Sequence, residues 1–291
     1  MSFVPFSTPQ PGRDQTWGLM HSRQGAQLQV PNKPVVFYDA PPDAATLAQI
    51  ESVHVWAPHG DPLTEMPALI ARLPSLVDLS MGPGAIDPSV MTGLRADMFP
   101  DSLRHLSLHP SQNTYTWKGG AMPRLESLTV GAALRFEPED FPALMSLTAV
   151  PDRRGVMLDR ALQLPLKELN LWNVPVDASV FDRLARLQLV ALGLVNGRTL
   201  ETLAGIEQLG GLRSLQVKNQ GILHTIRPIA ALSNLEKLNI QYCKRIADID
   251  VLGELSQLQE LTLVGCGDVG LGKLEETLRA RLRRSNIAAT T

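Results

Sequence analysis

The sequence predicts an α/β solenoid, a stack of coils that each contain one short strand and one helical turn. The first observation is a period, because the segment LEKLNIQYC from Leu235 is matched 23 positions later by LQELTLVGC from Leu258. The second is a frame of apolar residues at the first, fourth and sixth places of each repeat, as in a strand with one buried face. The third is a spacing of three between the apolar residues that follow, as at Ile246, Ile249 and Leu252, which suits a helical or 3₁₀ turn.

The N-terminal segment, residues 1–46, precedes the first repeat and is expected to cap it. The stretch GAQLQVPNKPVVFYDAPPD contains two short alternating runs broken by Pro31 and Pro34. Because proline cannot donate to a sheet ladder, this pattern predicts a hairpin or an edge strand that covers the first repeat. Residues before about Thr16 carry no such pattern, and we expect them to be mobile.

The repeat array occupies residues 47–266. The last five copies are spaced by 23 residues, whereas the earlier intervals range from 19 to 27. One repeat cannot enclose its own leucines, so stacking must bury them and align the strands in a parallel sheet. We therefore expect one elongated domain of about ten repeats rather than two globular domains. The strand frames begin at Ile50, Leu76, Leu103, Leu125, Leu144, Leu166, Leu189, Leu212, Leu235 and Leu258.

The C-terminal segment, residues 267–291, is expected to form a capping helix and a tail. Leu271, Leu274, Leu278 and Leu282 fall on one helical stripe. Glutamates stand early in this segment and arginines late, which complements the dipole of a helix. This arrangement favours a cap with a polar outer face over a small arginine patch for nucleic acid.

The repeats resemble the leucine-rich repeat, whose pattern is L-x-x-L-x-L-x-x-N/C-x-L. LEKLNIQYCKRI and LQELTLVGCGDV match that pattern, and IADIDVLGELSQ is similar to the convex segment of the internalin-like bacterial subtype. The resemblance covers roughly Leu47 to Cys266. It implies a horseshoe with a parallel β-sheet on the concave face and helical or 3₁₀ segments on the convex face.

The chain departs from this pattern at the asparagine or cysteine position. That position holds Cys243 and Cys266 in the last two copies, and in the three copies before them it holds Val174, Gly197 and Gln220. A continuous ladder of side-chain hydrogen bonds is therefore not expected through the three earlier copies. Asparagines stand one place before the departing residues and are expected to supply part of that hydrogen bonding, namely Asn173, Asn196 and Asn219.

Composition indicates a soluble, folded cytoplasmic protein. A chain of 291 residues that is 44% hydrophobic and 19% charged can bury a core. The formal net charge of −2 gives no global attraction to nucleic acid or to anionic lipid. No secretory signal, membrane-spanning apolar run or N-x-Ser/Thr site is found, and two cysteines make no disulfide framework.

The thiols and histidines do not form a recognisable catalytic or metal-binding set. Cys243 and Cys266 are expected to be buried at the ladder position, although thiols on stacked coils could also form a disulfide or share a metal. His105 and His109 lie on one predicted strand about 13 Å apart, and His54 lies two strands away, so they cannot chelate one ion. No phosphate-binding loop or nucleophile motif is present, and we expect no catalytic site, metal or cofactor.

Function is expected on the open face of the sheet, at residues two, four and six places after the start of each frame. These positions mix polar residues with two tryptophans and show no single charge sign, which suits a protein surface better than a phosphate backbone. Trp172 should lie near the centre of the array, unless the strand ends at Leu171 and the indole folds over the rim. The candidate protein-binding residues are His54, Trp56, Asp78, His105, His109, Glu168, Asn170, Trp172, Lys218, Lys237, Gln241 and Tyr242.

We therefore expect a non-catalytic protein that binds another protein and is a monomer when unbound. Three roles fit: an immunity protein that neutralises a toxin, an intracellular adaptor, or an exported effector. The first is preferred by analogy, because neutralising a toxin requires only a binding surface. The rival interpretation from a different class is an enzyme, which would need its catalytic group in the irregular N-terminal half.

Overall fold

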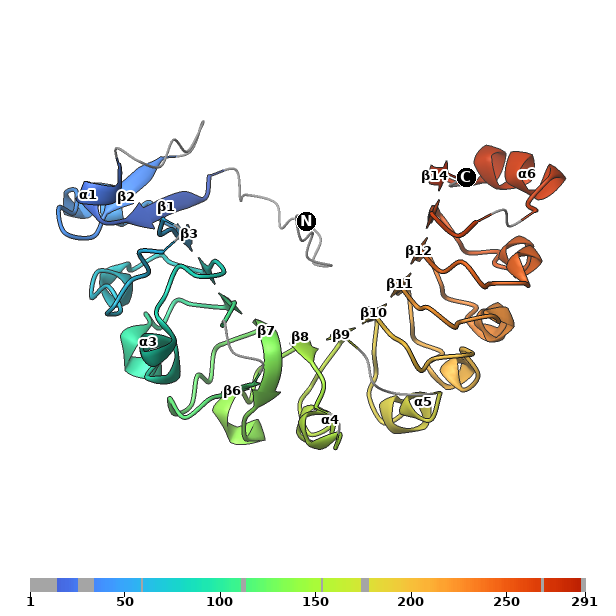
Figure 1. Cartoon of the computed structure of the whole chain (residues 1–291), viewed down its shortest axis with the longest axis horizontal. Helices are drawn as coiled ribbons and strands as arrows, with labels where there is room; N and C mark the ends of the chain where they lie inside the picture. Colours follow the sequence, from blue (N-terminus) through green and yellow to red (C-terminus); the bar gives the residue numbers. More distant parts are fainter. Residues whose placement is uncertain are drawn as a thin grey trace. The chain divides into compact units, whose positions relative to one another are not determined.

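A computed structural model describes residues 15–25, 34–58, 60–110, 114–152, 154–173, 178–267 and 270–288. The chain divides into two compact units, unit 1 (Met1–Ala149) and unit 2 (Val150–Thr291). Each unit is a row of coils with strands along one side and helices along the other (Figure 1). The solenoid predicted from the 23-residue period is thus confirmed, whereas the boundaries at residues 46/47 and 266/267 stay predictions.

Unit 1 is a parallel sheet in which the strand order departs from the chain order at the N-terminus. The described strands follow the order β2-β1-β3-β4-β5-β7-β8, and β6 pairs with the second half of the long strand β7. Its elements are β1 (Trp17–Met20), α1 (Ser22–Gly25), β2 (Val35–Phe37), α2 (Ala44–Leu47), β3 (Ser52–Val55), η1 (Ile70–Arg72), β4 (Asp78–Met81), α3 (Pro88–Thr92), η2 (Ala96–Met98), β5 (His105–Leu108), β6 (Thr114–Thr116), β7 (Ser127–Arg135), η3 (Pro138–Asp140) and β8 (Ser146–Val150).

The N-terminal cap differs from the predicted hairpin. The run VVF becomes the edge strand β2, as one of the two alternatives proposed, but β2 pairs in parallel with β1 and not as half of a hairpin. β1 lies between β2 and β3 and is the strand that covers the first repeat. β1 was not predicted, because WGLM is too short to show alternation. The run AQLQV and the residues before Asp14 lie outside the described part of the chain.

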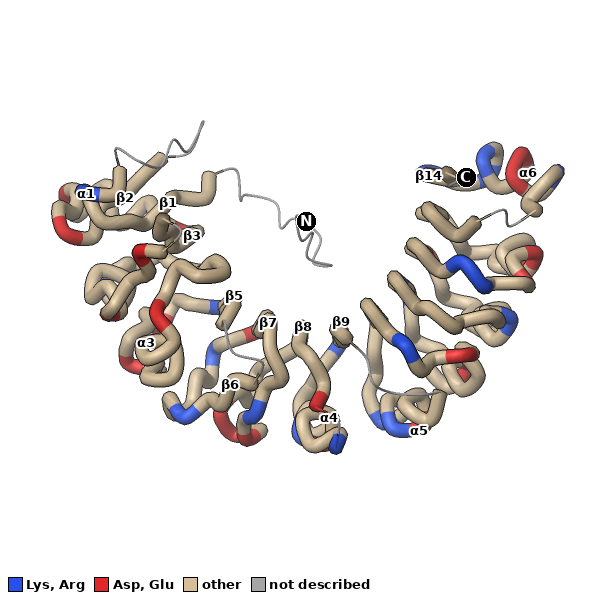
Figure 2. The backbone as a smooth tube through the Cα atoms, in the orientation of Figure 1, with Lys and Arg blue, Asp and Glu red and all other residues tan. Residues whose placement is uncertain are grey.

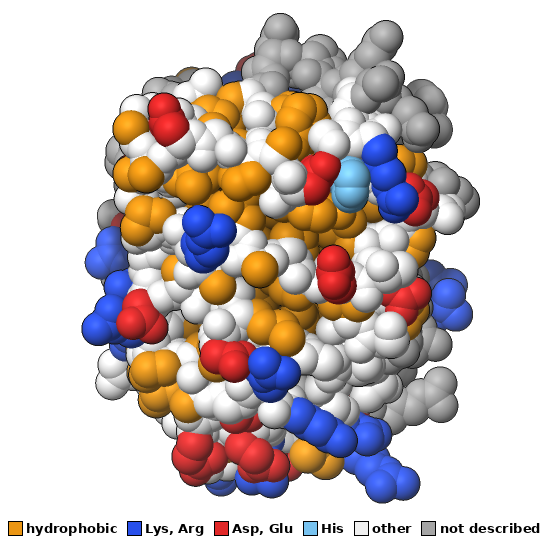
Figure 3. All heavy atoms as spheres, turned by 90° about the vertical axis from the view of Figure 1, so that its left-hand side faces the viewer, with side chains coloured by type: hydrophobic (Ala, Val, Ile, Leu, Met, Phe, Trp, Pro, Cys, Tyr) orange, Lys and Arg blue, Asp and Glu red, His pale blue; other side chains and the backbone are white. Residues whose placement is uncertain are grey.

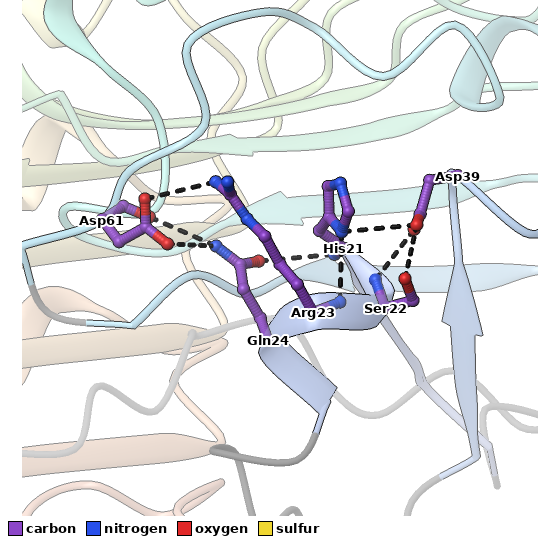
Figure 4. A network of polar contacts seen from close by, with 6 residues as sticks. All are labelled: His21, Ser22, Arg23, Gln24, Asp39 and Asp61. Carbon is purple, nitrogen blue, oxygen red and sulfur yellow. Dashed lines mark hydrogen bonds and ion pairs between the residues drawn. The ribbon is translucent and has the colours of Figure 1, made fainter.

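A polar network fastens the short helix α1 to the loops on either side of it (Figure 4). The Ser22 backbone N–H donates to the Asp39 carboxylate at 2.8 Å, and the buried Gln24 amide donates to Asp61 at 3.0 Å. On the face of this end shown in Figure 3, hydrophobic side chains gather between charged ones. Val35 and Phe37 of the edge strand are half-buried, as expected where a strand has a neighbour on one side only.

Unit 2 contains the regular repeats and follows the sequence period strictly. Leu192, Leu215, Leu238 and Leu261 are direct neighbours in the parallel sheet, so each coil is offset by 23 residues from the next. All four are at most 2% exposed. Its elements are α4 (Val156–Ala161), β9 (Glu168–Trp172), α5 (Val180–Leu184), β10 (Ala191–Val195), η4 (Ile206–Gln208), β11 (Ser214–Lys218), η5 (Arg227–Ala231), β12 (Lys237–Gln241), η6 (Ile249–Gly253), β13 (Glu260–Val264), α6 (Lys273–Arg281) and β14 (Arg284–Ala288).

The C-terminal cap contains the predicted helix and an additional strand. α6 buries Leu278, and Arg279 donates to Glu275 one turn earlier at 2.7 Å. The predicted tail is instead strand β14, which extends the sheet in parallel with β13. Its frame of Leu282, Ser285 and Ile287 lacks the central leucine of the other repeats, and this is why the pattern did not reveal it.

The ladder position is continuous over more coils than the motif indicated. The thiols of Cys243 and Cys266 each contact the carbonyl oxygen 26 residues earlier at 3.8 Å. Gln220 does the same with an amide, donating to the Leu194 carbonyl oxygen at 3.0 Å, also 26 residues earlier. The expectation that the ladder is interrupted at Gln220 is therefore wrong, because the longer amide reaches the equivalent acceptor. Gly197 provides the space, since a Cβ there would collide with the Gln220 amide.

The asparagines one place before the ladder have a different role from the one predicted. Asn173, Asn196 and Asn219 adopt left-handed backbone conformations with φ between 51° and 58°. They end each strand with a turn, and asparagine tolerates that conformation better than most residues. Their side chains are exposed and do not fill the buried ladder position. The Asn219 amide instead donates to the Asn196 side chain at 2.7 Å, which links two coils at the surface.

Candidate protein-binding surface

The open face of the sheet has the alternation that the sequence predicted. The frame residues point into the core, and the candidate residues between them are partly exposed, with Asn170 as the exception. Strand β9 continues through Trp172, which is a direct neighbour of Val195 in β10. The alternative in which the strand ends at Leu171 is therefore wrong, and Trp172 lies on the same face as Glu168 and Asn170. The candidates form two groups, one in each compact unit.

In unit 1, His54 and Trp56 form an aromatic pair at the strand β3. Their ring centroids are 5.0 Å apart in an edge-to-face arrangement. The His54 ring leans over Gly82 of the next coil, with Nε2 3.2 Å from the point a Cβ would occupy, and Trp56 lies beside Gly18. Both side chains therefore lie along the sheet surface and are held in place before any partner arrives.

The other candidates of unit 1 lie on the next two coils. Asp78 and His105 are direct neighbours in β4 and β5. His109 follows β5 and leans over Gly131, with Nδ1 3.2 Å from the position of a Cβ there. Burial lowers the pKa of His109, so the imidazole is neutral near pH 7. Within the described ranges, no group of three or more His, Cys, Asp or Glu side chains is arranged to hold a metal ion.

In unit 2, the first strand provides a hydrogen-bonding side chain that is almost fully covered. Asn170 is 6% exposed, and among the described residues its Oδ1 has no hydrogen-bond partner. The amide lies against Gly193 of the neighbouring strand, where a Cβ would collide with Oδ1. Trp172 lies two residues further along the same face and is half-buried. A large aromatic and a buried amide acceptor thus stand side by side on this strand.

The remaining candidates of unit 2 stand on β11, β12 and the turn after β12. Lys237 forms an ion pair with Glu260 on the neighbouring strand at 3.7 Å, and Gln241 donates to Asn239 at 2.8 Å. Tyr242 is 46% exposed and has a positive φ of 55°. An aromatic residue in that conformation costs about 1–3 kcal/mol, because its Cβ crowds the backbone.

Sequence reasoning overlooked the glycines that receive these side chains, namely Gly82, Gly131, Gly193 and Gly265. The sequence contained a clue to them, because the first three glycines fall at open-face positions of strands, where a glycine weakens the strand. A close approach of a neighbouring side chain is the usual reason for such a glycine. That reason is visible only when adjacent coils are placed in register.

The chain is similar to several solved structures and to no known family model. The sequence matches no protein-family model and no curated protein. The chain is similar to TLR13 in a TLR13–ssRNA13 complex, at 16% identity and a TM-score of 0.57, over 94% of this chain and 44% of that one. It also matches an internalin, inlF, of Listeria monocytogenes at 17% identity and a TM-score of 0.48, over 89% and 79% of the two chains. A leucine-rich-repeat protein of Leptospira interrogans matches at 17% identity and a TM-score of 0.40, over 82% and 65%.

The coil register, the buried leucine frame and the similarity to TLR13 together define the class: the chain has the leucine-rich-repeat fold. It spans less than half of the TLR13 chain, and at this level of identity the likeness extends to the fold alone. An open repeat sheet of this kind suits binding to another macromolecule. Among the described helices, none combines the length and apolar character needed to cross a bilayer.

Proposed function

We propose that the chain is a non-catalytic protein-binding protein that holds its partner against the open face of the sheet. The observation that carries this proposal is the pairing of Trp172 with Asn170. Large aromatic side chains dominate the affinity of many protein interfaces, and the half-buried Trp172 stands on the open face beside the Asn170 side chain. Because Asn170 rests on Gly193, its amide is already oriented, which reduces the entropy lost on binding.

The charge pattern of unit 2 favours a protein partner over a nucleic acid. Lys237 and Arg213 are paired with Glu260 and Glu236, whereas four other cations at one edge of the unit form no ion pair with a described residue. Four unpaired cations are few for a surface that follows a phosphate backbone. Mixed charges around aromatic anchors are typical of protein interfaces.

Among binding roles we prefer an immunity protein that neutralises a toxin in the cytoplasm and is a monomer when unbound. The preference rests on analogy, since neutralisation needs a binding surface and the coils provide one. An intracellular adaptor or an exported effector would use the same surface. An enzyme would need chemistry in unit 1, where His54, His105 and His109 are the side chains to examine.

The test is a pull-down of binding proteins from a lysate of the source cell. The parent chain, a Trp172→Ala variant and a Val156→Ala variant are each used as bait. Val156 is 49% exposed on helix α4, so its truncation is a matched apolar control away from the strands. A protein retained by the parent and by Val156→Ala, and lost by Trp172→Ala, would support open-face binding. Relief of that protein's toxicity on co-expression with the parent, and not with Trp172→Ala, would support the immunity role.

Two results would overturn the proposal. Capture of the same partner by all three proteins would exclude the open-face site. Turnover of a substrate by the purified chain, abolished by His54→Ala or His105→Ala, would replace binding with catalysis.

A further inference from the structure

Tyr242 breaks the pattern of the turn that ends each strand of unit 2. The equivalent positions hold Asn196 and Asn219 in the two preceding coils and Gly265 in the next, all with positive φ. Asparagine and glycine adopt this conformation readily, and a tyrosine adopts it under strain. The ring is also exposed, so burial does not compensate for the strain. A strained, exposed aromatic residue at the edge of a binding sheet indicates a functional role.

The Tyr242 ring is held in one orientation by its neighbours. It lies over Gly265 of the next coil, where a Cβ would collide with the ring. The Lys218 ammonium lies 5.9 Å from the ring centroid, within the range of a cation–π contact. The backbone ladder extends to this row, because the Tyr242 N–H donates to the Val264 carbonyl oxygen at 2.8 Å. The ring therefore contacts residues of both neighbouring coils.

Positive charge is concentrated in the segments that follow the strands on this side of unit 2. The three segments that leave β10, β11 and β12, residues 195–199, 218–222 and 241–245, contain four Lys or Arg residues and no Asp or Glu. These are Arg198, Lys218, Lys244 and Arg245, and none forms an ion pair with a described residue, in contrast to Lys237 and Arg213 nearby. Gly221 N–H donates to the Gly197 carbonyl oxygen at 3.2 Å, so these segments stack coil on coil. Figure 2 shows charged segments of both signs on the loops and helices of the unit 2 coils.

We propose that this surface, the basic edge, binds an acidic segment of a partner protein, with one apolar side chain of that segment packed on Tyr242. The basic edge consists of Arg198, Lys218, Tyr242, Lys244 and Arg245. Charge complementarity selects the acidic partner, and an exposed tyrosine selects a partner with an apolar group to cover it. Four cations are few for a nucleic acid, since such proteins commonly contact about 6–10 phosphates. Lys218 and Tyr242 also belong to the open-face candidates, and the proposal adds the kind of partner segment that this end of the face binds; it does not require the pairing of Trp172 with Asn170.

The experiment is a titration of the full chain with short probes, followed by backbone amide NMR. The probes are the capped peptide Glu-Glu-Phe-Glu-Glu, its counterpart Gln-Gln-Phe-Gln-Gln, and a 12-nucleotide oligouridylate (a length chosen to be about the site size of one binding fold). We expect the acidic peptide to shift the amides of Asn196, Asn219 and Tyr242, and to bind more weakly as salt rises. Lys218→Ala and Lys244→Ala should each weaken it by about 2- to 5-fold.

Two controls separate this site from the others. Arg186→Ala removes an exposed cation near helix α5 and should leave peptide binding unchanged. Trp172→Ala should also leave it unchanged, so failure of the open-face site would not affect this result. Equal binding of the glutamine peptide, tighter binding of the oligouridylate, or shifts confined to other coils would each overturn the proposal.

Tyr242→Asn distinguishes binding from a structural role. Asparagine is the residue of the two preceding coils and relieves the backbone strain. If the tyrosine serves recognition, the variant should keep or raise the melting temperature and bind the acidic peptide about 5-fold or more weakly. A lower melting temperature with unchanged peptide affinity would show that Tyr242 only stabilises the coil, and the proposal would be wrong.

Discussion

Gly197→Ala should destabilise unit 2 through one defined collision. A Cβ at Gly197 would overlap the Gln220 amide, which is fully buried and donates to the Leu194 carbonyl oxygen at 3.0 Å. Gly197 is outside the set of described residues with positive φ, so alanine is compatible with its backbone and the cost comes from the side chain of Gln220. Displacing that amide combines overpacking, about 1–3 kcal/mol, with a weakened buried hydrogen bond, about 1 kcal/mol. We expect a loss of about 2–3 kcal/mol in the free energy of unfolding.

A second substitution should remove most of this cost. Gln220→Cys installs the residue that the next two coils hold at the ladder position, and it leaves space for a methyl group at position 197. In that background Gly197→Ala should cost less than about 0.5 kcal/mol. Urea midpoints and m-values of the parent, the two single variants and the double variant give the coupling energy, expected to be about 1.5 kcal/mol or more. Equal costs of Gly197→Ala in the two backgrounds would refute the idea that Gln220 fills the ladder through this glycine.

Three further predictions concern one buried thiol and two half-buried titratable groups. Burial raises the pKa of Cys243 to about 12, so a thiol reagent at pH 8 should label this residue only at the rate of unfolding. Cys243→Ser should lower the free energy of unfolding, measured in urea, by about 1–3 kcal/mol. Rapid labelling of the native protein would contradict the burial of Cys243. Burial lowers the pKa of His109 in the folded state, so the neutral imidazole contributes stability above about pH 6.5. That stability should be lost as the pH falls through the lower pKa of the folded state. The urea midpoint of His109→Gln should therefore drop less between pH 7 and pH 5 than the midpoint of the parent. Burial opposes ionisation of Asp248, but hydrogen bonds from Thr225 and from the N–H groups of Ile226 and Arg227 outweigh burial and lower the pKa of this carboxyl group. Asp248→Asn should therefore lower the urea midpoint by an amount equivalent to about 1–3 kcal/mol. An unchanged midpoint would mean that these hydrogen bonds do not hold the coils together.

The leucine frame was sufficient to predict strands β9 to β13 of unit 2 and their register. Each frame residue must be buried between neighbours, so a period of 23 in the sequence becomes an offset of 23 in the sheet. The same reasoning placed Cys243 and Cys266 in the core, where they are 0% and 4% exposed. It also placed Trp172 on the open face.

The end strands and the contacts between coils could not be read from one repeat at a time. β1 buries Leu19 and Met20 without the three-residue frame, and β14 pairs with β13, whose Leu261 and Leu263 lie beside Ser285 and Ile287. Gln220 fits the ladder position because Gly197 lies beside it, and Asn170 packs against the neighbouring strand because that strand holds Gly193. Such pairs are properties of two coils in register, and a single-repeat pattern contains no information about them.

The most direct test of the central claim is a calorimetric titration of the recovered partner into the parent chain and its Trp172→Ala variant, with thermal melts of both. Truncating an aromatic anchor of an interface commonly costs about 2 kcal/mol, so the account predicts a dissociation constant at least about 30-fold higher for Trp172→Ala at an unchanged melting temperature. Trp56→Ala should have a smaller effect. A Trp172→Ala variant that binds like the parent, or that loses binding only because it has unfolded, would contradict open-face recognition.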